Sequence, residues 1–74
     1  MRRFRDRDGG EWEVVVGRES WGAAVAIFIP ASEGVEIRQA PLTASGYEAA
    51  ERELDRMGGA GLQDLLDRSQ PKTM

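Results

Sequence analysis

Apolar and polar residues alternate along the first half of the chain in a way that predicts β-strands. Trp12, Val14 and Val16 recur at every second position, so a strand over residues 11–17 has one apolar face. Residues 23–30 are apolar at successive positions, which is typical of a central strand. Two further strands are expected: residues 35–40 alternate and indicate an edge strand, and residues 2–6 supply a fourth.

Side chains select the register of the N-terminal hairpin. A three-residue loop over residues 7–9, with Gly9 in the left-handed conformation, pairs aromatic with aromatic and arginine with glutamate. Each such pair contributes about 0.2–1 kcal/mol, whereas a two-residue loop sets an aromatic ring opposite a carboxylate. The expected pairs are Phe4–Trp12, Arg3–Glu13 and Arg5–Glu11.

The other two hairpins follow from their loop lengths. A connection over residues 18–22 sets Trp12 opposite Phe28, and a connection over residues 31–34 sets Phe28 opposite Ile37. We therefore expect one sheet face to collect seven apolar side chains: Phe4, Trp12, Val14, Val16, Phe28, Val35 and Ile37.

The periodicity changes to that of a helix in the second half of the chain. An apolar stripe of Tyr47, Ala50, Leu54 and Met57 predicts a helix over residues 46–57, starting at a Ser45–Glu48 capping box and ending at Gly58–Gly59. Three leucines then indicate a short second helix over residues 61–69, and residues 70–74 are expected to fray. The chain is therefore predicted to be a single α+β domain over residues 1–74: a four-stranded antiparallel meander, then two helices.

Composition narrows the function classes. The chain contains no cysteine and no histidine, which excludes disulfides and the usual zinc and iron–sulfur ligand sets. The remaining catalytic candidates are weak, because the predicted hairpin gives the Glu11 and Glu13 carboxylates an arginine each. We expect a non-enzymatic cytoplasmic protein with no metal, no cofactor and no membrane-spanning segment.

A second apolar face carries the functional hypothesis. Val15, Val25, Ile27 and Ile29 point away from the predicted helix, and arginines and glutamates surround them. An apolar centre with a charged rim is the layout of a protein interface. One alternative is that the segment with Leu62, Leu65 and Leu66 crosses over to cover this face.

The loop after the second strand adds two candidate partner-binding residues. Arg18 and Trp21 belong to the residue types enriched at interface hot spots. Trp21 has an equal alternative role as a cap on the end of the core. The chain is thus interpreted as a protein interaction module, acting as a homo-oligomer or as a small accessory subunit of a larger assembly.

The alternative function is a nucleic-acid-associated regulator. Arg2, Arg3 and Arg5 alternate along the first strand around Phe4, a mixture of basic and aromatic residues used by single-strand binders. Asp6 interrupts the basic run, and the net charge of −3 lacks the basic excess of most nucleic-acid-binding domains. Nucleic acid is therefore the less favoured partner.

Overall fold

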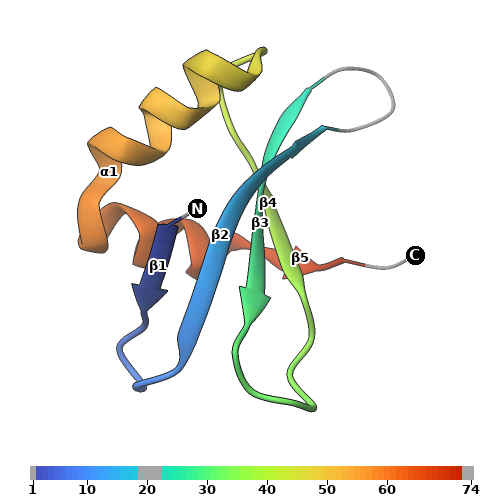
Figure 1. Cartoon of the computed structure of the whole chain (residues 1–74), viewed down its shortest axis with the longest axis vertical. Helices are drawn as coiled ribbons and strands as arrows, with labels where there is room; N and C mark the ends of the chain where they lie inside the picture. Colours follow the sequence, from blue (N-terminus) through green and yellow to red (C-terminus); the bar gives the residue numbers. More distant parts are fainter. Residues whose placement is uncertain (1, 19–22, 73–74) are drawn as a thin grey trace.

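An antiparallel sheet covered on one face by a helix makes up the part of the chain that the computed structural model describes, residues 2–18 and 23–72 (Figure 1). The strands follow one another across the sheet in sequence order. The elements are β1 (Arg2–Arg5), β2 (Glu11–Arg18), β3 (Ala24–Pro30), β4 (Arg38–Pro41), α1 (Tyr47–Arg68) and β5 (Gln70–Pro71). The predicted α+β meander followed by C-terminal helical structure is confirmed.

The fifth strand is an addition to the predicted sheet. A frayed tail was expected over residues 70–74, but Gln70 and Pro71 pair with Gln39 and Arg38 of β4. The backbone N–H of Lys72 also donates to the carbonyl of Ile37 at 2.8 Å. The end of the described chain is therefore held against the sheet edge.

The N-terminal hairpin has the predicted register. Gly9 has a φ of 87°, the left-handed conformation that the three-residue loop requires. The observed partners are Arg3 and Glu13, Phe4 and Trp12, and Arg5 and Glu11. The register predicted from aromatic and charge pairing is therefore confirmed at all three predicted pairs of this hairpin.

The predicted pairing of β3 with β4 is wrong by one residue. Phe28 lies opposite Arg38 rather than Ile37, and a shift of one residue moves every side chain of a strand to the other face. Val35 and Ile37, expected in the core, are therefore 47% and 42% exposed in the connection before β4. Arg38 is held on the helix side by Ser69, whose Oγ and carbonyl oxygen accept its hydrogen bonds at 2.7 and 2.6 Å.

The pairing of β2 with β3 is shifted by two residues from the expected one. Trp12 lies opposite Pro30, and Val14 lies opposite Phe28. Because the shift is even, each side chain keeps its face. The composition of the two sheet faces is consequently unchanged by this correction over β2 and β3.

The core is built around Phe28, which is fully buried between the sheet and α1. Its ring meets those of Phe4 and Trp12 edge to face, with centroids 6.5 and 6.2 Å apart. The helix contributes buried side chains from both of its halves: Ala50, Leu54, Leu62, Leu65 and Leu66. Tyr47, expected in this stripe, is 55% exposed, whereas Ala50 in the same turn of the helix is fully buried.

The start of α1 does not use the predicted capping box. Gly46 is the N-cap residue, and no side chain caps it. The carboxylate of Glu53 instead accepts hydrogen bonds from the backbone N–H groups of Thr43 and Ala44 at 3.2 and 3.0 Å. Glu53 therefore ties the segment before the helix to the helix itself, the role expected of Ser45 and Glu48.

A kink at Gly58 divides α1 into the two predicted halves. Gly58 has φ 65° and ψ −172°, a region of backbone space that essentially only glycine occupies.

We expect Gly58→Ala to lower the free energy of unfolding by about 1–3 kcal/mol in urea titrations, because alanine is strained there. Gly59→Ala is the matched control: an added Cβ meets nothing within 4 Å, so this change should be neutral or slightly stabilising. Equal losses for the two variants would contradict the assignment of the kink to Gly58.

Candidate interaction surface

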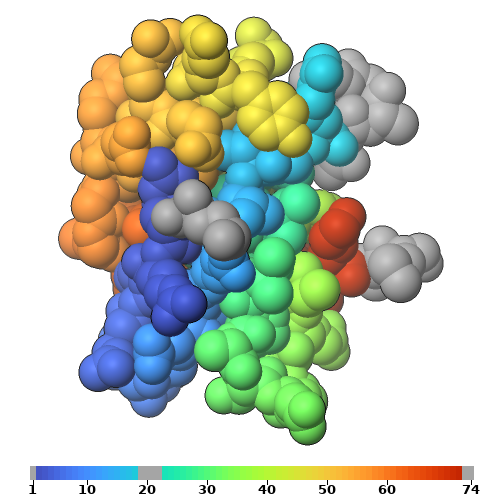
Figure 2. Space-filling model, viewed as in Figure 1, coloured from blue at the N-terminus to red at the C-terminus, as the bar shows by residue number. Residues whose placement is uncertain are grey.

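The sheet face away from α1 carries the residues predicted to bind a partner. Pairing places their side chains in rows across the strands, with Val15 beside Ile27, and Glu13 beside Ile29. Figure 2 shows β2 and β3 open at the front of the molecule, with the helix to the left and behind. We call this surface the open face; its described members are Arg3, Arg5, Glu11, Glu13, Val15, Gly17, Val25, Ile27, Ile29, Gln39 and Pro41.

The second half of the helix does not cross to this face. Leu62, Leu65 and Leu66 belong to the same core cluster as Leu54 and Phe28. The alternative in which these leucines cover Val15 and its neighbours is therefore wrong. Within the described residues, both halves of α1 pack on one side of the sheet.

The apolar centre of the open face is flatter than the sequence suggested. Ile27 lies over Gly17, where an added Cβ would be only 2.4 Å from Ile27 Cδ1 and 3.4 Å from Val25 Cγ2. Val25 is 6% exposed and thus already buried by its own chain, contrary to the expectation that a partner buries it. Val15, Ile27 and Ile29 are half-buried and form the part that another molecule can contact.

The rim of the open face carries both signs of charge. Arg5 Nη2 lies 3.5 Å from Glu11 Oε2, and both side chains are more than half exposed, so this ion pair is weak. Arg3 lies opposite Glu13 without forming an ion pair to any described residue. A hollow of about 140 Å³ is lined by three of these charged residues together with Ile29, Pro30 and Ala31.

The structure describes only one of the two candidate partner-binding residues in the loop after β2. Arg18 is exposed at the end of β2, beside the connection to β3. Trp21 lies outside the described residues, so its role stays a prediction.

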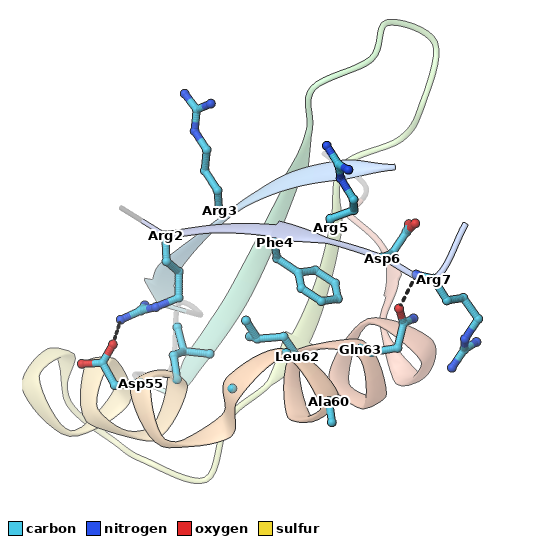
Figure 3. Close-up of a pocket in the computed structure, with 13 residues that line it drawn as sticks. Arg2, Arg3, Phe4, Arg5, Asp6, Arg7, Asp55, Ala60, Leu62 and Gln63 are labelled. Atoms are coloured by element: carbon cyan, nitrogen blue, oxygen red, sulfur yellow. Dashed lines mark hydrogen bonds and ion pairs between the residues drawn. The ribbon is translucent and has the colours of Figure 1, made fainter. Parts of the chain in front are cut away.

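The arginines predicted for nucleic-acid binding do not gather on one surface (Figure 3). Arg2 points to α1, where its guanidinium bonds to Asp55 and lies 3.3 Å from Glu51. Arg3 and Arg5 point to the opposite side of β1. This separation follows from strand alternation, which puts Arg2 on the same face as Phe4.

A groove between β1 and the kink of α1 was not predicted. It has a volume of about 650 Å³, and Phe4, Leu54 and Leu62 supply its apolar lining (Figure 3). The Arg2–Asp55 ion pair lies at one end, and the Arg7 N–H, which donates to Gln63 Oε1 at 2.8 Å, lies at the other. The glycines around residue 58 were the available sequence signal, but only the fold brings them beside β1.

The turn beside this groove contains a carboxylate with a lowered pKa. Asp6 accepts hydrogen bonds from Trp12 Nε1 and the Gly10 N–H at 2.8 Å, and from the Asp8 N–H at 3.0 Å. The Trp12 bond is the main cause that lowers the pKa of Asp6 below its ordinary value of 3.8, against the opposing effect of burial. The ionised carboxylate therefore stabilises the folded chain above that value, and the stabilisation is lost as the pH falls through the lower folded-state pKa.

This linkage has a measurable consequence. Asp6→Asn should be less stable than the wild type in urea at about pH 7, and the difference should be smaller in acid, once the pH has fallen through the lowered folded-state pKa of Asp6. Asp8→Asn removes the same charge from the neighbouring exposed position and is the control. An Asp6→Asn penalty of equal size at both pH values would show that charge on Asp6 contributes nothing.

The described residues contain neither a metal-ligating cluster nor a membrane-spanning helix. No group of three or more carboxylates within residues 2–18 and 23–72 is arranged to hold a metal ion. Over the same ranges, α1 lacks the apolar length needed to cross a membrane. Comparison of the chain with protein-family models, curated proteins and solved structures finds no match.

Proposed function

We propose that this chain is a non-enzymatic protein interaction module whose open face binds a second copy of the chain. One observation carries the proposal: both halves of α1 pack on the same side of the sheet, so no described helix covers Val15, Ile27 and Ile29. A fully buried β-branched side chain contributes about 1.5–3 kcal/mol relative to one in water, so burying the remaining surface of these three is favourable. A domain of this size has a small margin of stability and gains from such a contact.

The charges around the apolar centre favour a second copy over a highly charged partner. Two arginines and two glutamates leave the rim without net charge, so neither a strongly acidic nor a strongly basic surface complements it. A two-fold arrangement places apolar centre on apolar centre and lets each copy offer both signs to the other. The rim residues are Arg3, Arg5, Glu11 and Glu13.

The size of the open face sets the expected strength. Strands of this length at about 3.3 Å per residue, spaced about 4.8 Å apart, span roughly 500 Å² of sheet. Two such faces bury about 1,000 Å² together, the lower end of the range for specific interfaces. We therefore expect a reversible dimer with a dissociation constant in the micromolar range rather than an obligate one.

Sedimentation velocity over a series of concentrations tests this proposal. The expected result is a shift from monomer to dimer at micromolar concentrations that changes little with added salt, because the apolar centre and not the rim supplies the affinity. Monomeric behaviour up to about 1 mM would overturn self-association. It would then favour the other form of the hypothesis, an accessory subunit that uses the open face on a different protein.

A further inference from the structure

We infer that the free edge of β1 binds an extended segment of another protein by strand addition, and that this segment has an acidic–apolar–acidic sequence pattern. This edge and the groove beside it are separate from the apolar centre of the open face. The inference therefore goes beyond the proposed self-association and does not depend on it.

The backbone of β1 offers unpaired groups at this edge. The Glu11 carbonyl accepts from the Ala31 N–H at 2.9 Å, so Glu11 bonds towards β3 and Trp12 bonds towards β1. Trp12 pairs with Phe4, which leaves the N–H and C=O of Arg3 and Arg5 pointing outward. No described residue bonds to these outward groups.

The outward-facing row ends at a defined place. The next outward N–H, that of Arg7, is already bonded to Gln63 Oε1 at 2.8 Å. An incoming strand therefore finds two residues to pair with, Arg3 and Arg5, before the helix side chain blocks the edge.

The pattern of the incoming segment follows from the strand already bound to β1. On its inner side, β1 pairs Arg5, Phe4 and Arg3 with Glu11, Trp12 and Glu13 in that order. A strand on the outer side faces the same three side chains, so acidic residues opposite the two arginines and an apolar residue opposite Phe4 complement them. The apolar residue then points into the groove, beside Phe4 and Leu62 (Figure 3).

The groove has the room for such a segment, and the charge lies on the strand beside it. Its volume of about 650 Å³ extends to Gly58 and Gly59, where added Cβ atoms would meet nothing within 4 Å. Arg2 and Arg7 are paired with Asp55 and Asp67 of the helix, whereas Arg3 and Arg5 point to the other side of β1. The groove therefore supplies apolar contact to the residue opposite Phe4, and the two outward arginines supply the charge that favours an acidic ligand. The lining charged residues are Arg2, Arg3, Arg5, Arg7, Asp6 and Asp55.

Two other occupants fit this edge less well. A second β1 strand, paired antiparallel, sets arginine near arginine across the junction, and like charges directly opposite are destabilising. A nucleic acid requires clustered free cations, but Arg2 and Arg7 are held by Asp55 and Asp67 of the helix. An acidic peptide needs only the outward Arg3 and Arg5.

The test uses a capped synthetic peptide with Glu-Val-Glu at its centre, titrated into the ¹⁵N-labelled full chain. We expect the amide signals of Arg3 and Arg5 to shift, and those of Ile27 to stay in place. N-methylation of the two peptide glutamates removes their backbone donors without changing any charge, and it should abolish binding. A Lys-Val-Lys peptide should bind at least tenfold more weakly.

Two matched variants complete the test. Arg3→Glu/Arg5→Glu should lose the Glu-Val-Glu peptide at least tenfold and gain the Lys-Val-Lys peptide, whereas Arg52→Glu/Arg56→Glu, with the same charge change on the exposed helix surface, should bind as the wild type does. The N-methylated peptide decides the question on the wild type if the first variant fails to fold. Binding that survives N-methylation, shifts confined to Val15, Ile27 and Ile29, or binding of oligothymidylate in place of the peptide would each overturn strand addition.

Discussion

Phe4→Ala should lower the free energy of unfolding by about 3–5 kcal/mol, the range for truncation of a buried aromatic residue. Phe4 is 8% exposed, and its ring packs edge to face on Phe28 at the centre of the core. It is also the one large apolar side chain of β1, so its loss weakens the attachment of the whole edge strand. In a domain with a small margin, such a loss leaves much of the population unfolded at room temperature.

Urea titration followed by circular dichroism measures this effect. Arg3→Glu changes the neighbouring residue of the same strand and is the control; it should cost about 1 kcal/mol or less, because Arg3 is exposed. Similar losses in the free energy of unfolding for the two variants would contradict the assignment of Phe4 as the residue that attaches β1 to the core.

Ile27→Glu should separate the dimer, weakening self-association at least 100-fold, while the monomer remains folded. The substitution places two carboxylates at the middle of a two-fold contact, where each loses water without gaining a partner. Phe28 and the leucines of α1 lie on the other face of the sheet, so the core keeps its packing. A modest loss of stability is expected because Ile27 is half-buried over Gly17.

Ala60→Glu is the control for this prediction. Ala60 is exposed on α1, which packs on the other side of the sheet, so introducing a carboxylate there should leave the dimer intact. Sedimentation velocity of the two variants gives the comparison, with circular dichroism to show that both are folded. If Ile27→Glu simply unfolds the chain, or if both variants dissociate equally, the open face is not the contact surface.

The N-terminal hairpin could be predicted from sequence because its side chains distinguish the possible registers. Moving Phe4 by one residue would set it against Glu13, so aromatic and charge pairing agreed on one answer. The third hairpin offered no such choice. Val35 and Ile37 alternate as a strand does, but Arg38 is drawn to the helix side by Ser69, a contact thirty-one positions away in the chain. Local alternation cannot report a contact of that kind.

The helical half shows the same division between local and distant causes. The glycines predicted the break at Gly58, since its conformation is a local property of the backbone. The side on which the second half packs depends on where the kink redirects the chain, and the sequence left two possibilities open. The leucines of the second half pack on the sheet face that bears Phe28, in the same cluster as Leu54.

The candidate surfaces, too, could be predicted from the sequence only in part. The alternation of side chains along β2 and β3 was sufficient to place Val15, Ile27 and Ile29 on one face. It could not show that Val25 is buried by its own chain beside Gly17. The groove beside β1 joins residues more than fifty positions apart, so no pattern within a single segment could reveal it.

The most direct test of self-association through the open face is an isotope-filtered nuclear Overhauser experiment. Equal amounts of ¹³C-labelled and unlabelled chains are mixed at a concentration where the dimer is populated. We expect intermolecular signals among the methyl groups of Val15, Ile27 and Ile29, and none to the exposed methyl of Ala60 on α1. Intermolecular signals centred on Ala60 and its neighbours in α1, or no intermolecular signals at any concentration, would contradict the proposal that this face binds a second copy of the chain.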